Sequence, residues 1–216
     1  MGFAEEEPGT LRPGGRTARV RAAVLRAAGD TLAEQGFAHL DLAEVARRAE
    51  VGRTTVYRRW GTVTALVADL LRDMAEQSLP RTETGSLLGD LRANARLVQR
   101  TSADPRQGAL FRAVIAAATC DPKTAEALRS FYDVRVEEWA PCVRQAVDRG
   151  ELPEGTDAHE VIRAVSAPLY YRLLTGGAPV DEAAADRAAE AAVAAARAGV
   201  YVGEPSARNS ARQGGT

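Results

Sequence analysis

Residues 49–60 read AEVGRTTVYRRW, and this stretch decides how the rest of the chain is interpreted. Val56 and Trp60 stand four residues apart, so they share one face of a helix predicted over residues 53–59. The remaining positions of that helix are basic, hydroxylated or aromatic, and they form its outer face. Glu50 occupies the place where the chain must turn sharply before the helix, a position that glycine usually fills. The stretch therefore predicts a short two-faced helix that follows an unusual turn.

A second short helix is predicted immediately before this turn. Asp41 is a favourable N-cap, and Leu42, Val45, Ala46 and Ala49 recur on one face. The small side chains of the alanines allow the two helices to pack closely together. Two short helices joined by a turn of three or four residues form a helix-turn-helix. Arginines on the outer face of the second helix can pair with guanine O6 and N7 or with phosphates. The pattern favours DNA binding, and a solvated polar face on an ordinary helical pair is the alternative that pattern alone leaves open.

The candidate DNA-contacting residues lie mainly on the second helix of this pair. They are Arg16, Arg47, Gly52, Arg53, Thr54, Thr55, Tyr57, Arg58 and Arg59. The positive charge of the chain is concentrated in the same region. Residues 10–60 carry ten arginines and five acidic residues, a net charge of +5, whereas the whole chain has a net charge of −1. A basic segment on a nearly neutral chain is typical of a DNA-binding part joined to something else.

Helical periodicity extends over the rest of this chain of 216 residues, which is rich in alanine, the strongest helix former. A helix is predicted over residues 62–80 with Thr62 as its N-cap, and further helices are predicted over residues 87–101, 105–118, 122–149, 157–175 and 181–200. Glycine and proline lie between these segments, and no strand-like alternation is visible. We therefore expect an all-α fold of about nine helices. A flexible N-terminal arm is expected over residues 1–15 and a disordered tail over residues 203–216. Between them we expect a three-helix DNA-binding domain over residues 16–62, with a connecting helix to about residue 80. A larger ligand-binding and dimerisation domain is expected over residues 63–202.

The sequence offers little for catalysis or metal binding. His39 and His159 are its only histidines and belong to no metal-binding spacing, and Cys120 and Cys142 stand alone. No nucleophile-elbow, phosphate-loop or dinucleotide motif is present. We expect no enzyme activity, cofactor or metal; a helical enzyme or a helical protein-interaction scaffold without DNA binding stays the alternative. No signal peptide or membrane-spanning apolar run is visible, so the expected location is the cytoplasm.

Aromatic residues in the middle helices mark a candidate ligand pocket. Pro141 and Pro168 fall inside helical patterns, where proline removes a hydrogen bond and bends the axis. Bent helices lined with aromatic side chains leave room for a small apolar ligand, and an ordinary packed core with two kinks is the alternative. The candidate pocket residues are Phe111, Phe131, Tyr132, Trp139, Cys142 and Tyr170.

The last two predicted helices are the candidate dimer surface. A single helix-turn-helix of this size binds DNA weakly, and such motifs normally act as two-fold dimers on palindromes. Apolar residues of these helices would pack as a four-helix bundle across the two-fold axis, or else form the core of a single chain. The candidate interface residues are Val161, Val165, Leu169, Leu173, Ala188, Ala192 and Ala195.

Residues 16–80 resemble the DNA-binding domain of the TetR family of bacterial transcriptional regulators. The signature stretches are AEQGF, LDLAEVARRAEVGRTTVYRRW and TVTALVADLL. Later, LRSFYDV with RQAVDRGELP, and APLYYRLLTGGAPVDEAAADR, resemble the C-terminal domain of one subgroup. The resemblance implies that residues 52–58 enter the major groove, that neighbouring helices contact phosphates, and that the last two helices form a homodimer interface. It also implies a small-molecule effector that changes the spacing of the two DNA-binding domains, with repression relieved by the ligand.

Two positions depart from the family pattern. Glu50 replaces the usual turn glycine, and a positive φ at this residue would cost about 1 kcal/mol or somewhat more. Val63 stands where many relatives place a lysine that contacts a phosphate, which puts that contact in question. Trp60 takes a place where the family often has phenylalanine, and it is expected in the core.

Overall fold

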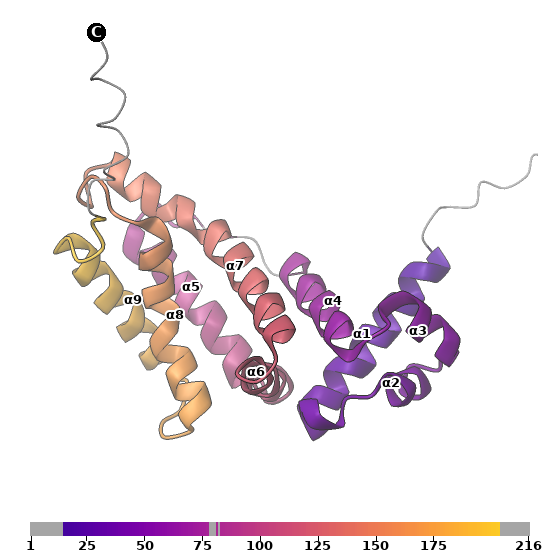
Figure 1. Ribbon diagram of the computed structural model, residues 1–216. Helices are drawn as coiled ribbons and strands as arrows, with labels where there is room; N and C mark the ends of the chain where they lie inside the picture. Colours follow the sequence, from indigo (N-terminus) through magenta and orange to yellow (C-terminus); the bar gives the residue numbers. More distant parts are fainter. Residues whose placement is uncertain (1–14, 78–80, 82, 204–216) are drawn as a thin grey trace, which may run out of the picture.

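The computed structural model describes residues 15–77, 81 and 83–203. Over these residues the chain forms nine α-helices, one short 3-10 helix and an isolated β-bridge between Thr156 and Val202 (Figure 1). The prediction of an all-α fold with about nine helices is confirmed. The expected flexible arm, apart from Gly15, and the expected disordered tail, apart from Gly203, lie outside the described residues. No helix in the described ranges has the length and apolar character needed to cross a membrane.

The N-terminal part consists of four helices and a single 3-10 turn. They are α1 (Gly15–Gln35), η1 (Phe37–His39), α2 (Leu42–Arg48), α3 (Arg53–Trp60) and α4 (Val63–Glu76). The side chains of Asp41 and Thr62 accept hydrogen bonds from the backbone N–H groups of Ala43 and Ala65. They cap α2 and α4, as the sequence predicts, because each satisfies a donor that the first helical turn leaves free.

Five longer helices follow. They are α5 (Leu87–Ala103), α6 (Pro105–Ala118), α7 (Pro122–Asp148), α8 (Ala158–Thr175) and α9 (Glu182–Arg197). Their N-caps are Ser86, Asp104, Asp121, Asp157 and Asp181, whose side chains all accept backbone N–H groups of the first turn. Both α7 and α8 continue through an internal proline, Pro141 and Pro168 respectively.

Two hydrophobic clusters hold the molecule together. The C-terminal cluster joins α5, α7, α8 and α9, and the N-terminal cluster joins α1 to α4. The N-terminal cluster also takes in Leu110 and Phe111 of α6 and Leu128 of α7. The predicted boundary at residue 62 falls between α3 and α4, yet the apolar core continues past it. Figure 1 shows the result, with α4 beside α7 and α6 seen nearly end-on between the two parts.

Candidate DNA-binding site

Helix α3 buries one face and exposes the other. Val56 is fully buried and Trp60 is 8% exposed, and both belong to the N-terminal cluster. The outward positions are Arg53, Thr54, Thr55, Tyr57, Arg58 and Arg59, all exposed except the half-buried Thr55. Gly52 is the N-cap and provides no side chain, so no cap competes for the first N–H groups of the helix. A free helix N-terminus flanked by arginines suits a phosphate oxygen.

The turn between α2 and α3 closes as a Schellman motif. The N–H of Val51 donates to the carbonyl of Ala46 at 2.9 Å, and the N–H of Glu50 donates to the carbonyl of Arg47 at 3.2 Å. Glu50 has a φ of 54°, and within the described part of the chain no other non-glycine residue has a positive φ. Val51 packs against the N-terminal cluster. The turn therefore keeps its geometry without glycine, because two hydrogen bonds and an apolar contact offset a strain of about 1 kcal/mol.

A polar cluster attaches α3 to α1 and α4. Trp60 Nε1 donates to Asp69 at 2.9 Å, and Arg21 donates to the two carboxylate oxygens of Asp69 at 3.0 and 3.1 Å. Arg21 also pairs with Asp73 at 2.5 Å. Burial opposes ionisation of Asp69, but the hydrogen bonds from Arg21 and Trp60 outweigh it and keep the pKa of this carboxyl below its ordinary value. One ionised carboxylate thus orients α3 relative to both α1 and α4.

Arg16 lies near α3 although it belongs to α1. It borders a hollow together with Glu50, Gly52, Arg58 and Arg59. Three guanidinium groups around one carboxylate leave this hollow positively charged, which suits a phosphate of the DNA backbone. Arg59 also lies over the ring of Trp60, 5.2 Å from its centroid, so packing orients its side chain.

Arg47 projects from α2 and already has a partner. Its guanidinium donates to both oxygens of Glu44 at 2.7 and 2.8 Å. Hydrogen bonds from Arg47 and Arg48 lower the pKa of Glu44 to about 2. Because the Arg47 side chain is 72% exposed, this pair is a surface ion pair, and a DNA phosphate can replace Glu44 at little cost. Val63, by contrast, is half-buried against the N-terminal cluster and provides no charge at the start of α4.

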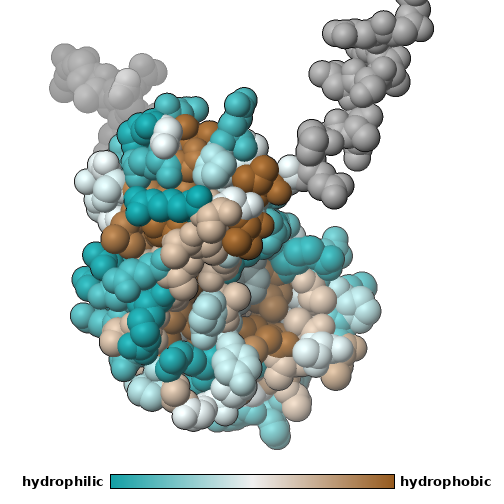
Figure 2. Space-filling model, turned by 90° about the vertical axis from the view of Figure 1, so that its left-hand side faces the viewer, coloured by the Kyte–Doolittle hydropathy of each residue, from teal (hydrophilic) through white to brown (hydrophobic). Residues whose placement is uncertain are grey.

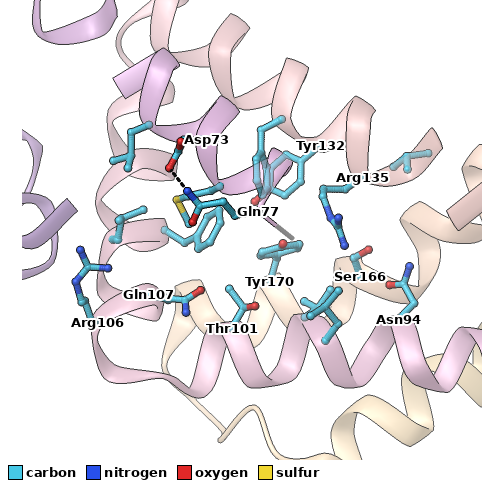
Figure 3. Close-up of a pocket in the computed structure, with 18 of the residues that line it drawn as sticks. Asp73, Gln77, Asn94, Thr101, Arg106, Gln107, Tyr132, Arg135, Ser166 and Tyr170 are labelled. Carbon is cyan, nitrogen blue, oxygen red and sulfur yellow. Dashed lines mark hydrogen bonds between the residues drawn. The ribbon is translucent and has the colours of Figure 1, made fainter. Parts of the chain in front are cut away.

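A cavity of about 540 Å³ lies between the N-terminal and C-terminal helices, a volume typical of small-molecule sites (Figure 3). Five of the six predicted pocket residues line it, namely Phe111, Phe131, Tyr132, Trp139 and Tyr170. Cys142 does not line it. This residue is fully buried in the C-terminal cluster, and burial raises the pKa of its thiol to about 12.

Sequence reasoning missed the polar side chains of this cavity. Figure 3 shows Asn94, Arg135 and Ser166 toward one end, from α5, α7 and α8, and Asp73 and Gln77 of α4 nearer the other. A weak signal existed for Asn94, since it shares its helical stripe with Leu87, Leu91 and Ala95, although Asp90 is a second polar residue buried there. No sequence signal brings together residues from three separate helices.

The residues predicted for a dimer interface require a correction. Six of the seven are buried inside the single chain, with exposed fractions of 0–5%: Val161, Val165, Leu169, Leu173, Ala188 and Ala192. Only Ala195 keeps partial exposure. These six side chains pack in the chain's own two clusters, so they leave little surface for contact with a second copy.

The outward faces of α8 and α9 carry a different set of apolar residues. Tyr171 is 69% exposed and Leu174 is 49% exposed on α8, beside Ala167, and α9 exposes Ala191 and Ala194. Figure 2 looks onto this end of the molecule and shows apolar atoms among hydrophilic side chains. This mixed surface is available to a partner, unlike the buried stripe.

Comparisons with known proteins agree with this geometry. Residues 24–70 match the family described as "Bacterial regulatory proteins, tetR family", and residues 81–192 match "Tetracyclin repressor-like, C-terminal domain". The chain is 32% identical over 161 residues to the HTH-type transcriptional regulator YdeS of Bacillus subtilis, covering 74% of this chain and 81% of the relative. It is 30% identical over 165 residues to the DNA-binding transcriptional repressor TetR of Mycobacteroides abscessus, covering 75% and 85% respectively.

A solved structure extends the likeness to the three-dimensional fold. The crystal structure of the TetR family transcription regulator SCO0332 aligns with a TM-score of 0.65 and 30% identity, covering 82% of this chain and 97% of that one. The family and these relatives are transcriptional regulators and not enzymes. With α2 and α3 as its DNA-binding helix-turn-helix, the chain belongs to the TetR family of bacterial transcriptional regulators.

Proposed function

We propose that this protein is a dimeric repressor that binds a palindromic operator through α3 and is released by a small molecule in the cavity. The observation that carries the proposal is the exposed, basic outer face of α3, which is rigidly oriented from behind by Trp60 and Asp69. Outward arginines supply base and phosphate contacts, and a fixed helix loses little entropy on binding. The relative from Mycobacteroides abscessus is a repressor, which favours repression over activation. The site of action is the cytoplasm, where bacterial DNA lies.

The dimer is proposed to form through the outward faces of α8 and α9. Tyr171 and Leu174 provide large exposed apolar surface, and the alanines of α9 allow close helix approach. A two-fold axis here would present two copies of α3 to successive major grooves on one side of the DNA. Two copies on a palindrome also explain how a helix of 8 residues achieves useful affinity.

Ligand release follows from where the cavity lies. Its wall includes Leu25 of α1 and Asp73 and Gln77 of α4, besides residues of α5 to α8. Asp73 also pairs with Arg21, the residue that fixes Asp69 behind α3. A ligand that displaces Gln77 or Asp73 therefore shifts α4 and the orientation of α3. A coupling of this kind between ligand binding and DNA binding changes the affinity for DNA by about 5- to 150-fold.

Gel-shift titration of the DNA flanking the protein's own coding region tests the proposal. Wild type should bind a palindromic fragment in a salt-sensitive, sequence-dependent manner. The double variant Arg53→Ala, Tyr57→Ala should weaken specific binding at least about tenfold, because it removes an outward base or phosphate contact at each position. Arg129→Ala, which removes an exposed arginine from α7, is the matched control and should bind as wild type does. Equal binding by the double variant and wild type would refute α3 as the DNA-contacting helix.

A further inference from the structure

One end of the cavity contains a polar side chain with no partner. Asn94 is only 4% exposed, and its amide makes no hydrogen bond to any residue in the described part of the chain. It lines the cavity, and Figure 3 shows it beside Ser166 and Arg135. The amide atoms are open to the cavity, so a ligand that fills it must offer them a hydrogen-bond partner or leave them desolvated at a cost of about 1–3 kcal/mol.

Arg135 supplies a charge at the same end. Its side chain is 14% exposed, and Nη1 donates to Glu138, one turn along α7. That pair orients the guanidinium, and its Nε and Nη2 groups have no other partner among the described residues. Ser166 contributes a hydroxyl, now donated to the carbonyl of Ile162 at 3.1 Å. Two N–H groups of an arginine and an amide NH2 form a donor set suited to a carboxylate, and the Ser166 hydroxyl adds a donor when it rotates away from Ile162.

The charged residues of the remaining wall favour an anion over a cation at this site. The lining residues include three arginines, Arg26, Arg106 and Arg135, and one acidic residue, Asp73. Asp73 is already paired with Arg21, so it offers little uncompensated negative charge. Arg106 pairs with Asp30 at 2.6 Å, which lies outside the lining. An anion is therefore favoured over a cation of equal size.

A row of aromatic rings leads away from the polar end. Successive ring centroids of Phe111, Phe131, Tyr132 and Tyr170 lie 5.5, 5.3 and 5.2 Å apart. The last two pairs meet edge to face, the arrangement that aromatic rings prefer. The hydroxyl of Tyr132 is buried and has no hydrogen-bond partner among the described residues. This wall suits a flat apolar body with an acceptor group along its edge.

We infer that the ligand of this cavity is a small aromatic carboxylic acid, with its carboxylate between Arg135, Asn94 and Ser166 and its ring against Tyr132 and Tyr170. The inference rests on the proposed function in one respect, namely that the cavity serves an effector. It deepens that function by naming the chemical class. A primary amide of the same shape offers Arg135 and Asn94 one acceptor oxygen and no negative charge, so it should bind there more weakly than the acid.

Calorimetric titration of the full-length protein tests the inference with three acids and their primary amides: benzoate, 2-naphthoate and 4-phenylbutanoate. Each amide matches its acid in shape and lacks the charge. At least one acid should bind about tenfold or more tightly than its amide, the difference that a charge-assisted hydrogen-bond pair supplies. Arg135→Met should reduce that preference to about threefold or less, and Asn94→Ala should weaken acid binding by about three- to tenfold. The control Arg129→Met, an exposed position on the same helix, should keep the preference.

The outcomes separate the two claims. If no acid binds more tightly than its amide, or if a folded Arg135→Met protein keeps the preference, the inference is wrong whatever the protein does on DNA. Should Arg135→Met fail to fold, Asn94→Ala decides, and unchanged acid affinity in that variant overturns the inference. The gel shift without ligand is scored separately, so loss of DNA binding would remove the proposed repressor and leave the calorimetric result standing.

Discussion

Replacing Glu50 with glycine should stabilise the protein. The residue has a φ of 54°, where an L-residue with a Cβ costs about 1–2 kcal/mol. Glycine relieves that strain, but it also makes the unfolded chain more flexible, which costs about 0.4–1 kcal/mol. The Glu50 side chain is exposed and makes no hydrogen bond or ion pair with the described residues, so the loss is confined to its longer-range attraction to the arginines of the hollow, which Glu50→Ala loses equally. The net expectation is a gain of about 0.5–1 kcal/mol, or a rise in Tm of about 1–4 °C for a chain of this size.

The control separates backbone strain from charge. Glu50→Ala removes the carboxylate but keeps the Cβ, so it should gain no stability. Thermal and urea unfolding of the three proteins at one salt concentration measure the difference. A Glu50→Gly protein no more stable than Glu50→Ala would refute the claim that the turn is strained.

The same two variants make an independent prediction about DNA. Glu50 lies in the hollow formed with Arg16 and Arg58, and its charge repels a phosphate there. Both substitutions remove the charge, so both should tighten DNA binding by a similar factor, up to about fivefold at low salt. Fluorescence anisotropy with the operator fragment measures this. Tighter binding by the glycine variant alone would show that turn flexibility, rather than charge, limits binding.

Three further predictions concern stability and assembly. Asp69→Asn should destabilise the protein by about 1–3 kcal/mol at pH 7, because it removes the ion pair that holds α3. The pKa of Asp69 is lowered in the folded state, so its contribution to stability is complete above the unfolded pKa of about 3.9 and is lost as pH falls through the folded value. The difference in unfolding free energy between Asp69→Asn and wild type, measured in urea, should therefore shrink on acidification. A difference that stays constant would contradict this. Gly108→Ala should cost about 1–3 kcal/mol, since its Cβ would lie 2.4 Å from the backbone carbonyl oxygen of Ser102 in α5. Gly29→Ala should cost less, because its Cβ would crowd the guanidinium tip of Arg106 at 2.8 Å and meet Leu110 at an ordinary 3.4 Å. The reverse order in thermal unfolding would refute the packing assigned to α5 and α6. Leu174→Glu should convert the proposed dimer to a monomer in sedimentation experiments, because it would bury a charge in the proposed interface. Val134→Glu, at a position 53% exposed on α7, is the control and should sediment as wild type does.

Local sequence signals were sufficient for the DNA-binding part. Asp41 and Thr62 were identifiable as N-caps, and the spacing of Val56 and Trp60 assigned the faces of α3. The turn at Glu50 was also identifiable, as a place where glycine was expected and absent. These features depend on neighbours within one or two helical turns, so the chain order by itself determines them.

The C-terminal part shows the limit of such signals. An apolar stripe on α8 predicts that Val161 and Val165 are buried, but periodicity does not say whether the chain's own helices or a second copy buries them. On α9, alanines occupy nearly every face, and only docking against α5 and α8 decides which of them turn inward. The polar end of the cavity is likewise a tertiary feature, because Asn94, Arg135 and Ser166 come from three helices. The sequence alone determined the fold class and the buried and exposed faces of α3, whereas the cavity, its donors and the surface left for a partner depend on long-range packing that no local pattern encodes.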